Sequence, residues 1–316
     1  MTILVAGGAG FIGSHLVHRL LTGSQQQIVV YDNLSSGTLQ HLEPHLHEPR
    51  LRIVQADLKD QAALTEAMQG VDMVYHLASN PNIALAATQP DVDFWEGTYL
   101  TNNILEAMRV NRAGKITYAS GSGVYGDAGP VAVSEGYSPM RPVSTYAASK
   151  LACEAMICAY CHLFEMTGRI YRFANVVGPR QTHGVGFDFI RRLRQDPAHL
   201  QILGDGRQSK SYIYVDDVLD AIAWTCDRTT ERFDVFNVAT GDYITVSEIA
   251  RLAIDVSGLS PASVELVYTG GERGWKGDVP IVRFDLARIH ATGWHARRNS
   301  YQALRDSMQA MLNEIS

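Results

Sequence analysis

Short, mostly apolar runs alternate with longer amphipathic stretches through the first half of this chain. The runs lie at residues 3–6, 28–31, 51–55, 73–77, 116–119 and 170–173. Three stretches between them, 12–21, 98–110 and 146–165, repeat apolar positions at helical spacing. Apolar strands that alternate with helices are typical of a parallel sheet covered by helices on both faces. The pattern therefore predicts an α/β fold with a Rossmann-type, doubly wound parallel sheet.

The pattern loosens after residue 173, where glycine-containing turns interrupt shorter elements. Further helices are predicted at 216–227, 246–256 and 301–314. We therefore predict a Rossmann domain over residues 1–173, with a later return near 212–240, and a smaller lobe formed mainly by residues 174–316. In a doubly wound sheet ligands bind beyond the carboxyl ends of the strands, so the residues that follow each strand carry the candidate chemistry.

Composition narrows the classes of function. The 316 residues are 46% hydrophobic and 19% charged, with a formal net charge of −6, which is ordinary for a globular enzyme. No basic cluster marks a nucleic-acid footprint. The first apolar run has neither a basic segment before it nor a small-residue cleavage site after it, and no run reaches membrane-spanning length. We expect a cytoplasmic protein with no nucleic-acid or membrane partner.

Four cysteines do not form a disulfide framework in a chain of this length. Cys158 and Cys161 have CxxC spacing, but they lie deep in a predicted helix, away from the helix start that redox pairs use. No second Cys or His pair stands at metal-ligand spacing. We interpret the cysteines as core-facing side chains and predict no metal site.

A glycine-rich turn joins the first predicted strand to the first predicted helix. Gly7, Gly10 and Gly13 allow a tight turn, close approach of a pyrophosphate and close packing of helix on strand. Asp32 follows Gly13 by 19 residues, where a carboxylate accepts hydrogen bonds from ribose hydroxyls and repels a 2′-phosphate. The 1–173 domain is therefore predicted to bind NAD, although Asp32 could also be a solvated turn residue. The pair 57–58 could reach the adenine edge or cap a helix.

Tyr146 and Lys150 lie four residues apart on a predicted helix and therefore share one of its faces. A tyrosine phenol ordinarily titrates near about pH 10, so it needs a nearby fixed cation to act as a base near neutral pH. The spacing alone occurs easily by chance in a chain with 14 tyrosines. Its place downstream of a nucleotide-binding turn makes the pair a candidate for hydride-transfer chemistry.

With these residues the chain resembles the extended short-chain dehydrogenases/reductases, and within them the UDP-hexose 4-epimerases. The resemblance covers essentially the whole chain and is carried by motifs at 7–14 (GGAGFIGS), 31–37 (YDNLSSG), 76–78 (HLA), 124–126 (VYG), 146–150 (YAASK), 172–179 (RFANVVGP), 212–217 (YIYVDD) and 276–278 (KGD). It implies an NAD-dependent isomerase of nucleotide-sugar metabolism that acts on a UDP-sugar, of the UDP-glucose/UDP-galactose type. It also implies a homodimer.

The resemblance implies roles for individual residues. Tyr146 would take the proton from the sugar 4-hydroxyl, Lys150 would hold the phenolate and bond the cofactor ribose, and a transient 4-keto sugar would accept hydride back at C4. The cofactor would bind at Gly7, Gly10, Phe11, Ile12, Gly13, Asp32, Asn33, Ser35, Ser36, Gly37, Asp57, Leu58, Leu77, Ala78, Tyr146 and Lys150. The UDP-sugar would bind at Ser122, Tyr146, Asn175, Phe187, Arg192, Leu203, Lys210, Arg273 and Lys276. The basic residues in that second set could also be plain surface charge.

Three places depart from the family pattern. In the later strand motif, Lys210-Ser211 replaces the family's Arg-Asp, which weakens any bidentate contact with a phosphate. Gly121 stands where the family usually has the Ser or Thr that contacts the reacting oxygen. Ser120 and Ser122 flank it, and either hydroxyl could take that place; we favour Ser122 and keep both as catalytic candidates. Gly97 stands where the family often has an Asn near the cofactor.

Three other functions remain open on the sequence. A UDP-glucuronate 4-epimerase would need a cation for the sugar carboxylate, which Arg191 or Arg192 could supply unless both lie on an exposed helix face. A nucleotide-sugar 4,6-dehydratase would need an acid–base pair just before Val-Tyr-Gly, where this chain has Ser122 and Gly123. A non-enzymatic NAD-sensing module would have no reason to keep Tyr146 and Lys150.

Overall fold

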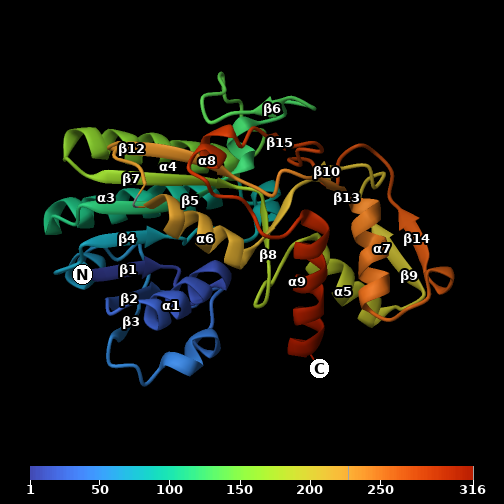
Figure 1. Cartoon of the computed structure of the whole chain (residues 1–316), viewed down its shortest axis with the longest axis horizontal. Coiled ribbons are helices and arrows are strands. Elements are labelled where there is room, and N and C mark those ends of the chain that lie inside the picture. The colour runs from blue at the N-terminus through green and yellow to red at the C-terminus, as the bar shows by residue number, and fades with distance from the viewer. Residues whose placement is uncertain (227, 316) are drawn as a thin grey trace. The chain divides into compact units, whose positions relative to one another are not determined.

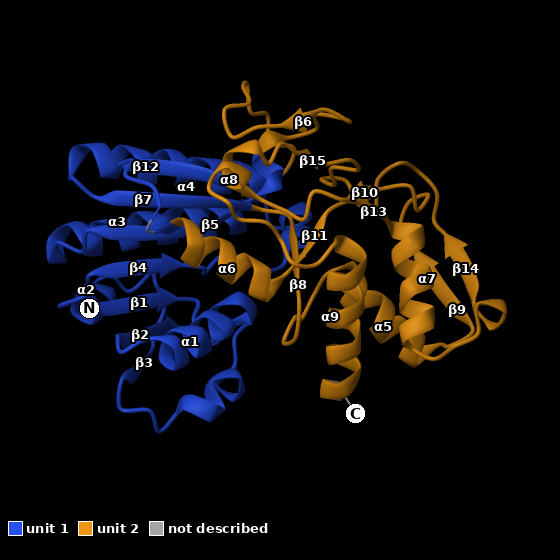
Figure 2. Ribbon diagram, in the orientation of Figure 1, with its two compact units in different colours: residues 1–124, 145–172, 226–236 blue, residues 125–144, 173–225, 237–316 orange. Residues whose placement is uncertain are grey.

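The structure is a computed structural model that describes residues 1–226 and 228–315. The chain folds into two compact units, coloured separately in Figure 2. The first unit comprises residues 1–124, 145–172 and 226–236, and the second comprises 125–144, 173–225 and 237–316. Asp227, the last residue of the helix predicted at 216–227, lies outside the described residues.

A seven-stranded sheet with the strand order β12-β7-β5-β4-β1-β2-β3 forms the frame of the first unit. Its strands are β1 (Thr2–Ala6), β2 (Gln27–Asp32), β3 (Leu51–Gln55), β4 (Met73–His76), β5 (Lys115–Gly121), β7 (Thr167–Phe173) and β12 (Phe233–Val238). The pairs β1–β2, β1–β4, β2–β3 and β4–β5 are all parallel. The order runs outward from β1 in both directions, so the switch point lies between β1 and β4. The Rossmann-type parallel sheet predicted from the apolar runs is confirmed.

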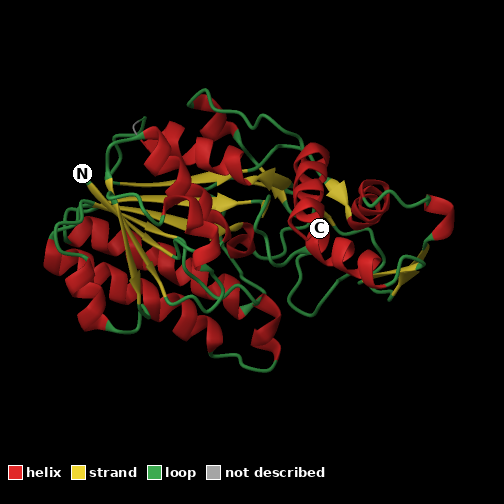
Figure 3. Ribbon diagram, turned by 90° about the horizontal axis from the view of Figure 1, so that it is seen from below, coloured by secondary structure: helices red, strands yellow, loops and turns green. Residues whose placement is uncertain are grey.

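Helices cover both faces of this sheet, whose strands fan out in Figure 3. The helices α2 (Gln61–Ala67), α3 (Tyr99–Asn111) and α4 (Thr145–Leu163) share one apolar core with alternate residues of β1 and β2, such as Leu4 and Val29. The other residues of those strands, such as Ile3, are buried on the opposite face, where α1 (Phe11–Gly23) packs (Figure 1). Burial on both faces explains why these strands are continuously apolar.

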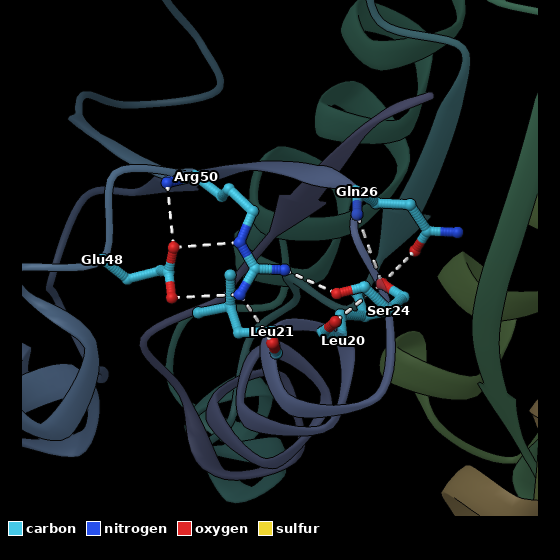
Figure 4. Close-up of polar contacts among 6 residues, drawn as sticks. All are labelled: Leu20, Leu21, Ser24, Gln26, Glu48 and Arg50. Carbon is cyan, nitrogen blue, oxygen red and sulfur yellow. Dashed lines mark hydrogen bonds and ion pairs between the residues drawn. The ribbon is translucent and has the colours of Figure 1, made fainter.

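Arg50 fixes the end of α1, the helix that follows the glycine turn (Figure 4). Its guanidinium donates to the carbonyl oxygens of Leu21 at 2.8 Å and Ser24 at 2.5 Å, which the helix itself leaves without partners. Glu48 holds the guanidinium from the other side, with an Nε–Oε1 distance of 2.9 Å. A cation at a helix carboxyl terminus is also favoured by the helix dipole. Arg50 therefore fixes the carboxyl end of α1, and the glycine turn fixes its start.

The helix predicted at 98–110 is preceded by a helical turn of another type, which the apolar spacing did not indicate. A π-helical turn, η3 (Phe94–Thr98), leads into α3. Short helical turns also occur at η1 (Leu39–His45), η2 (Ile83–Ala87) and η4 (Ser122–Tyr125). The Gly97 backbone lies so close to α4 that an added Cβ would come 2.4 Å from Ser149 Oγ. A side chain at position 97 would therefore force the Ser149 hydroxyl to move.

The second unit is built from short two-stranded sheets and helices. Its strands pair as β8 (Asn175–Val177) with β11 (Tyr212–Tyr214), β9 (His199–Ile202) with β14 (Glu265–Tyr268), β10 (Ser209–Lys210) with β13 (Ile244–Thr245), and β6 (Ala132–Val133) with β15 (Arg283–Phe284). Its helices are α5 (Val185–Gln195), α6 (Val215–Cys226), α7 (Val246–Val256), α8 (Ala287–Ala291), α9 (Ser300–Ile315) and the turn η5 (Pro261–Ser263). In residues 1–226 and 228–315 we find no helix with the length and apolar character that crossing a membrane requires.

Candidate active site

The glycine turn brings backbone against backbone where β1 ends. A Cβ added at Gly13 would lie 2.1 Å from the Gly7 carbonyl oxygen, and one added at Gly7 would lie 2.8 Å from the Ala78 nitrogen. Gly7 also has a φ of +80°, which glycine adopts without strain. In the described structure no side chain caps the N-terminus of α1 at Gly10, so its N–H groups remain available to an anion. These features fit the pyrophosphate of a dinucleotide.

Asp32 ends β2 beside this turn and is almost completely buried. Its Oδ2 accepts the Ala9 N–H at 2.9 Å and its Oδ1 accepts the Leu34 N–H at 2.9 Å. Each oxygen keeps a lone pair for a ribose hydroxyl, and the negative charge disfavours a 2′-phosphate. The next residues are also tied to the turn, since a Cβ added at Gly37 would lie 2.8 Å from the Ala9 carbonyl carbon.

The remaining cofactor candidates gather at the carboxyl ends of neighbouring strands. Asn33 donates to the Asp57 carboxylate at 3.0 Å. Burial of Asp57 opposes its charge, but hydrogen bonds from the Lys59 N–H and from Asn33 outweigh it and lower the pKa of the Asp57 carboxyl. The others are Phe11 and Ile12 at the start of α1, exposed Ser35 and Ser36, buried Leu58, and Leu77 and Ala78 after β4. All of these candidates lie within the first unit.

Lys150 lies buried within the first unit and reaches the end of β5. Its Nζ donates to the Ala119 carbonyl oxygen at 2.8 Å and lies 5.5 Å from the centroid of the Tyr146 ring. Helix α4 starts at Thr145, so Tyr146 stands on its first turn and Lys150 on the next. The Tyr146 hydroxyl makes no hydrogen bond within residues 1–226 and 228–315, which leaves it open to a substrate. The structure thus brings the predicted base and cation together.

The two serine candidates have different surroundings. Ser120 is buried, and its hydroxyl donates to Glu154 Oε1 at 2.5 Å. Arg172 holds the same carboxylate, with Nη2 2.6 Å from Glu154 Oε2. Ser122 is half-buried, and its hydroxyl makes no hydrogen bond to another residue that the structure describes. The Ser120 hydroxyl is therefore already hydrogen-bonded to a buried carboxylate, whereas the Ser122 hydroxyl can still bond to a substrate.

Asp93 is a buried carboxylate next to the site that the sequence analysis missed. Its Oδ2 accepts the hydroxyl of Thr145 at 2.7 Å, and its Oδ1 accepts the Asn80 amide at 2.9 Å. The carboxylate therefore ties the loop after β4 to the residue that starts α4. No pattern in the sequence marks it, because its partners lie 13 and 52 residues away along the chain.

The position of the absent asparagine is filled by a different contact. Ser149 Oγ lies 2.9 Å from Thr98 Oγ1, directly beside Gly97. Thr98 follows Gly97 in η3, and Ser149 precedes Lys150 in α4. The contact between η3 and α4 is thus made by hydroxyl groups rather than by an amide side chain.

In the second unit the predicted phosphate ligands are already paired with carboxylates. Lys210 Nζ lies 2.5 Å from Asp278 Oδ1. Arg273 donates to Asp127 Oδ2 at 2.7 Å and to the Asp278 carbonyl oxygen at 2.5 Å. Lys276 is exposed. Lys210, Arg273 and Lys276 thus all lie in the second unit. The first two have acidic partners that no sequence spacing revealed.

The other substrate candidates of the second unit are more dispersed. Asn175 donates its amide to the Ser211 carbonyl oxygen at 3.3 Å, at the pairing of β8 with β11. Arg192 on α5 donates to the Gln201 carbonyl oxygen at 2.6 Å. Phe187 is half-buried on the same helix, and Leu203 is 43% exposed after β9. The Arg192 guanidinium is therefore engaged with backbone of its own unit.

Comparisons with known proteins place this chain in a family. The UDP-glucose 4-epimerase of Mycolicibacterium smegmatis is 34% identical over 248 residues, which cover 76% of this chain and 78% of that protein. The dTDP-glucose 4,6-dehydratase of an Actinoplanes species is 31% identical over 273 residues, or 83% of each chain. A crystal structure of UDP-galactose 4-epimerase is similar over 100% of both chains, with a TM-score of 0.88 and 36% identity.

The family model agrees with the cofactor that the glycine turn and Asp32 predicted. The model described as "NAD dependent epimerase/dehydratase family" matches residues 3–239, which include both the turn and the Tyr146–Lys150 pair. The NAD prediction and the prediction of an NAD-dependent nucleotide-sugar enzyme are confirmed. The chain belongs to the NAD-dependent epimerase/dehydratase family.

Proposed function

We propose that this protein is a UDP-hexose 4-epimerase of the UDP-glucose/UDP-galactose type, acting through a transient 4-keto sugar. One observation carries the proposal. The Lys150 ammonium is buried and fixed at 2.8 Å from the Ala119 carbonyl oxygen, with its Nζ 5.5 Å from the Tyr146 ring. A cation held there stabilises a phenolate, and a phenolate is the base that oxidation of a sugar hydroxyl requires.

The chain's own groups account for the proton transfers. Tyr146 takes the proton of the sugar 4-hydroxyl and later returns it. The Ser122 hydroxyl donates a hydrogen bond to the same sugar oxygen and orients it toward Tyr146. The glycine turn, Asp32 and Lys150 would hold NAD, which would supply a reversible acceptor for the C4 hydride. Return of the hydride to the opposite face of the 4-keto sugar would invert C4, so the reaction would consume no external oxidant.

The absence of carboxylates before the Val-Tyr-Gly motif favours epimerisation over dehydration. A 4,6-dehydratase must remove a proton at C5 and protonate the leaving hydroxyl at C6. Positions 122 and 123 hold Ser122 and Gly123, and neither can do so. Relatives of this chain are named for both reactions, so their names do not decide between them, and this local difference supports epimerisation.

The second unit supports recognition of the UDP group. Arg273 and Lys210 supply cations that can bind a diphosphate, and Lys276 adds a third, exposed cation. Recognition of a uronate is less favoured, because Arg192 donates to the Gln201 carbonyl oxygen and Arg191 is paired with Asp188 on the same helix. The homodimer and the cytoplasmic location expected from the resemblance stay predictions.

Purified protein incubated with UDP-galactose, UDP-glucose, UDP-glucuronate or their N-acetyl analogues, without added oxidant or reductant, tests the proposal. We expect UDP-galactose and UDP-glucose to interconvert. Tyr146→Phe should lower turnover about 100- to 10 000-fold, the usual contribution of a positioned acid–base group, while NAD stays bound. Tyr160→Phe on the same helix is the matched control and should keep its turnover.

Other outcomes would overturn the proposal. No interconversion in any pair would remove the epimerase function. Loss of the 6-hydroxyl from a product would point to a dehydratase, and turnover of UDP-glucuronate alone would move the substrate to a uronic acid. Full activity in Tyr146→Phe would remove Tyr146 from the role of base.

A further inference from the structure

The Lys150 ammonium lies against a second aromatic ring that belongs to neither the family motif nor the predicted site. Its Nζ is 4.9 Å from the centroid of Tyr118, closer than the 5.5 Å to Tyr146. Lys150 is only 5% exposed, and the carbonyl oxygen of Ala119, the residue after Tyr118 on β5, accepts one of its three N–H groups at 2.8 Å. A desolvated ammonium over a ring face is in the arrangement where cation–π attraction is strongest.

Tyr118 is held rigidly in this place. It is 1% exposed on β5, directly opposite His76 of β4 in the parallel register. The two ring centroids are 5.1 Å apart. The Tyr118 phenol also lies beside the Cys153 side chain, which is one turn after Lys150 on α4. Tyr118 therefore joins β5 to α4 directly behind the ammonium.

The groups that surround the ammonium from the other elements carry no competing charge. Burial raises the pKa of Tyr118 well above its usual 10, so this ring stays a neutral phenol. Burial, and then the nearby Lys150 charge, lowers the pKa of His76 to about 3, so the imidazole is neutral. Glu154, one turn along α4, is neutralised by Arg172. Lys150 thus depends on a ring face and one carbonyl for its position.

We propose that Tyr118 is a positioning residue for Lys150: its ring face binds the ammonium and fixes it beside Tyr146. The inference rests on the proposed function for the consequence in catalysis, but the placement of the ammonium is independent of it. Tyr118 touches neither the sugar nor the cofactor in this role, and it acts only through Lys150.

The placement can be measured on the protein without substrate. The chain has five lysines, so NMR of protein labelled at the lysine ε-carbons gives a short set of signals, and Lys150→Met identifies one of them. The ring face should move the Lys150 ε-protons upfield. Tyr118→Leu should abolish most of that shift, and Tyr118→Phe, which keeps the ring, should restore it.

The catalytic consequence is measured on the holoenzyme. Tyr118→Leu should lower turnover about ten- to thirtyfold, the ratio expected for loss of a desolvated cation–π contact. Its acid limb should move to higher pH, because a displaced ammonium stabilises the phenolate less. Tyr118→Phe should recover most of the loss. Tyr171→Leu, which removes another fully buried tyrosine from β7, is the control for general destabilisation and should move neither the Lys150 signal nor the acid limb.

The outcomes separate this proposal from the proposed function. A Tyr118→Leu protein with an unchanged Lys150 signal, or with a turnover loss that is equal at every pH, would overturn the positioning role. If Tyr118→Leu does not fold, Tyr118→Met gives the same comparison with a flexible apolar side chain. If the wild-type protein interconverts no UDP-sugar, the epimerase proposal fails, and the NMR comparison alone then decides where Lys150 is held.

Discussion

The charged groups of the two units differ in how they are held. In the first unit Glu154 and Arg172 are 5% and 3% exposed and meet at 2.6 Å, and Lys150 is buried with them. In the second unit Lys210 and Arg273 are 25% and 39% exposed, and each faces one carboxylate. The first set resembles a fixed internal frame, and the second a set of ion pairs that solvent can reach.

This difference separates two tasks. A buried ion pair has lost its hydration, so removal of one partner leaves an uncompensated charge in a region of low dielectric. Such a pair holds its side chains in one arrangement, and replacement of either partner by another ligand costs much free energy. A half-exposed pair is screened by water, and its attraction is small enough for a ligand phosphate to replace the carboxylate. The first unit is thus suited to hold reacting groups, and the second to bind and release an anion.

Removal of the charge at Glu154 should have the largest effect among the variants that test this difference between the two units. Glu154→Gln leaves the Arg172 guanidinium buried without its counter-charge, and we expect a loss of about 3–5 kcal/mol in the free energy of unfolding. Urea unfolding followed by circular dichroism measures it. Arg109→Gln, which breaks the exposed pair with Glu106, is the matched control and should shift the urea midpoint far less. Equal shifts in both variants would contradict the distinction.

A second, smaller effect comes from the neutral imidazole in the buried frame. The pKa of His76 is lowered to about 3 in the folded state, so the unfolded state binds more protons below its ordinary value of 6.5. The stability that the neutral His76 contributes above pH 6.5 is therefore lost as the pH falls from 6.5 towards the folded-state pKa of about 3. Between about pH 7.5 and about pH 5 the contribution of His76 should amount to about 2 kcal/mol.

The measurement compares urea unfolding of wild type and His76→Gln at the two pH values. The variant has no imidazole to protonate, so it should lose less stability on acidification than wild type. An identical loss in both proteins would show that other groups cause the acid sensitivity and that His76 does not belong to the frame.

The smallest effect tests the exchangeable pairs of the second unit. Arg273→Gln should weaken binding of UDP about tenfold, because one charge-assisted hydrogen bond to phosphate is lost. Asp127→Asn should strengthen binding a few-fold, since the phosphate no longer competes with that carboxylate for Arg273. Calorimetric titration with UDP measures both changes, and Arg251→Gln, at an exposed position of α7, is the control.

Opposite signs for Arg273→Gln and Asp127→Asn are the essential result. If removal of the Asp127 charge also weakened binding of UDP, the pair would be a structural unit of the same kind as Glu154 and Arg172. The contrast between the two units would then disappear.

The parts of the fold that local sequence determines were predictable. The helix predicted at 246–256 is α7 with the same limits, because the Thr245–Glu248 capping box marks its start and Gly258 follows its end. The proximity of Asp32 to the glycine turn and of Lys150 to Tyr146 was also predictable, since each depends on spacing within one strand–turn–helix unit or one helix.

Contacts between distant segments could not be predicted in this way. Asp127 and Arg273 are 146 residues apart, and Ser120 and Glu154 are 34 apart, so no spacing rule connects them. The role of Tyr118 is hidden for the same reason, because an aromatic residue in an apolar strand is indistinguishable from ordinary core. Sequence identified the candidate reacting groups, and only the fold revealed what holds them.

The close approach at Gly97 has a consequence for how this chain can change over generations. An asparagine introduced there would collide with Ser149 Oγ, which lies 2.4 Å from where its Cβ would stand, and would break the Ser149–Thr98 contact. The Ser149 hydroxyl would have to rotate away from Thr98, so a side chain at 97 would be gained at the expense of one contact between η3 and α4. The residues at positions 97 and 149 are therefore coupled, and the effect of a change at one depends on the side chain at the other.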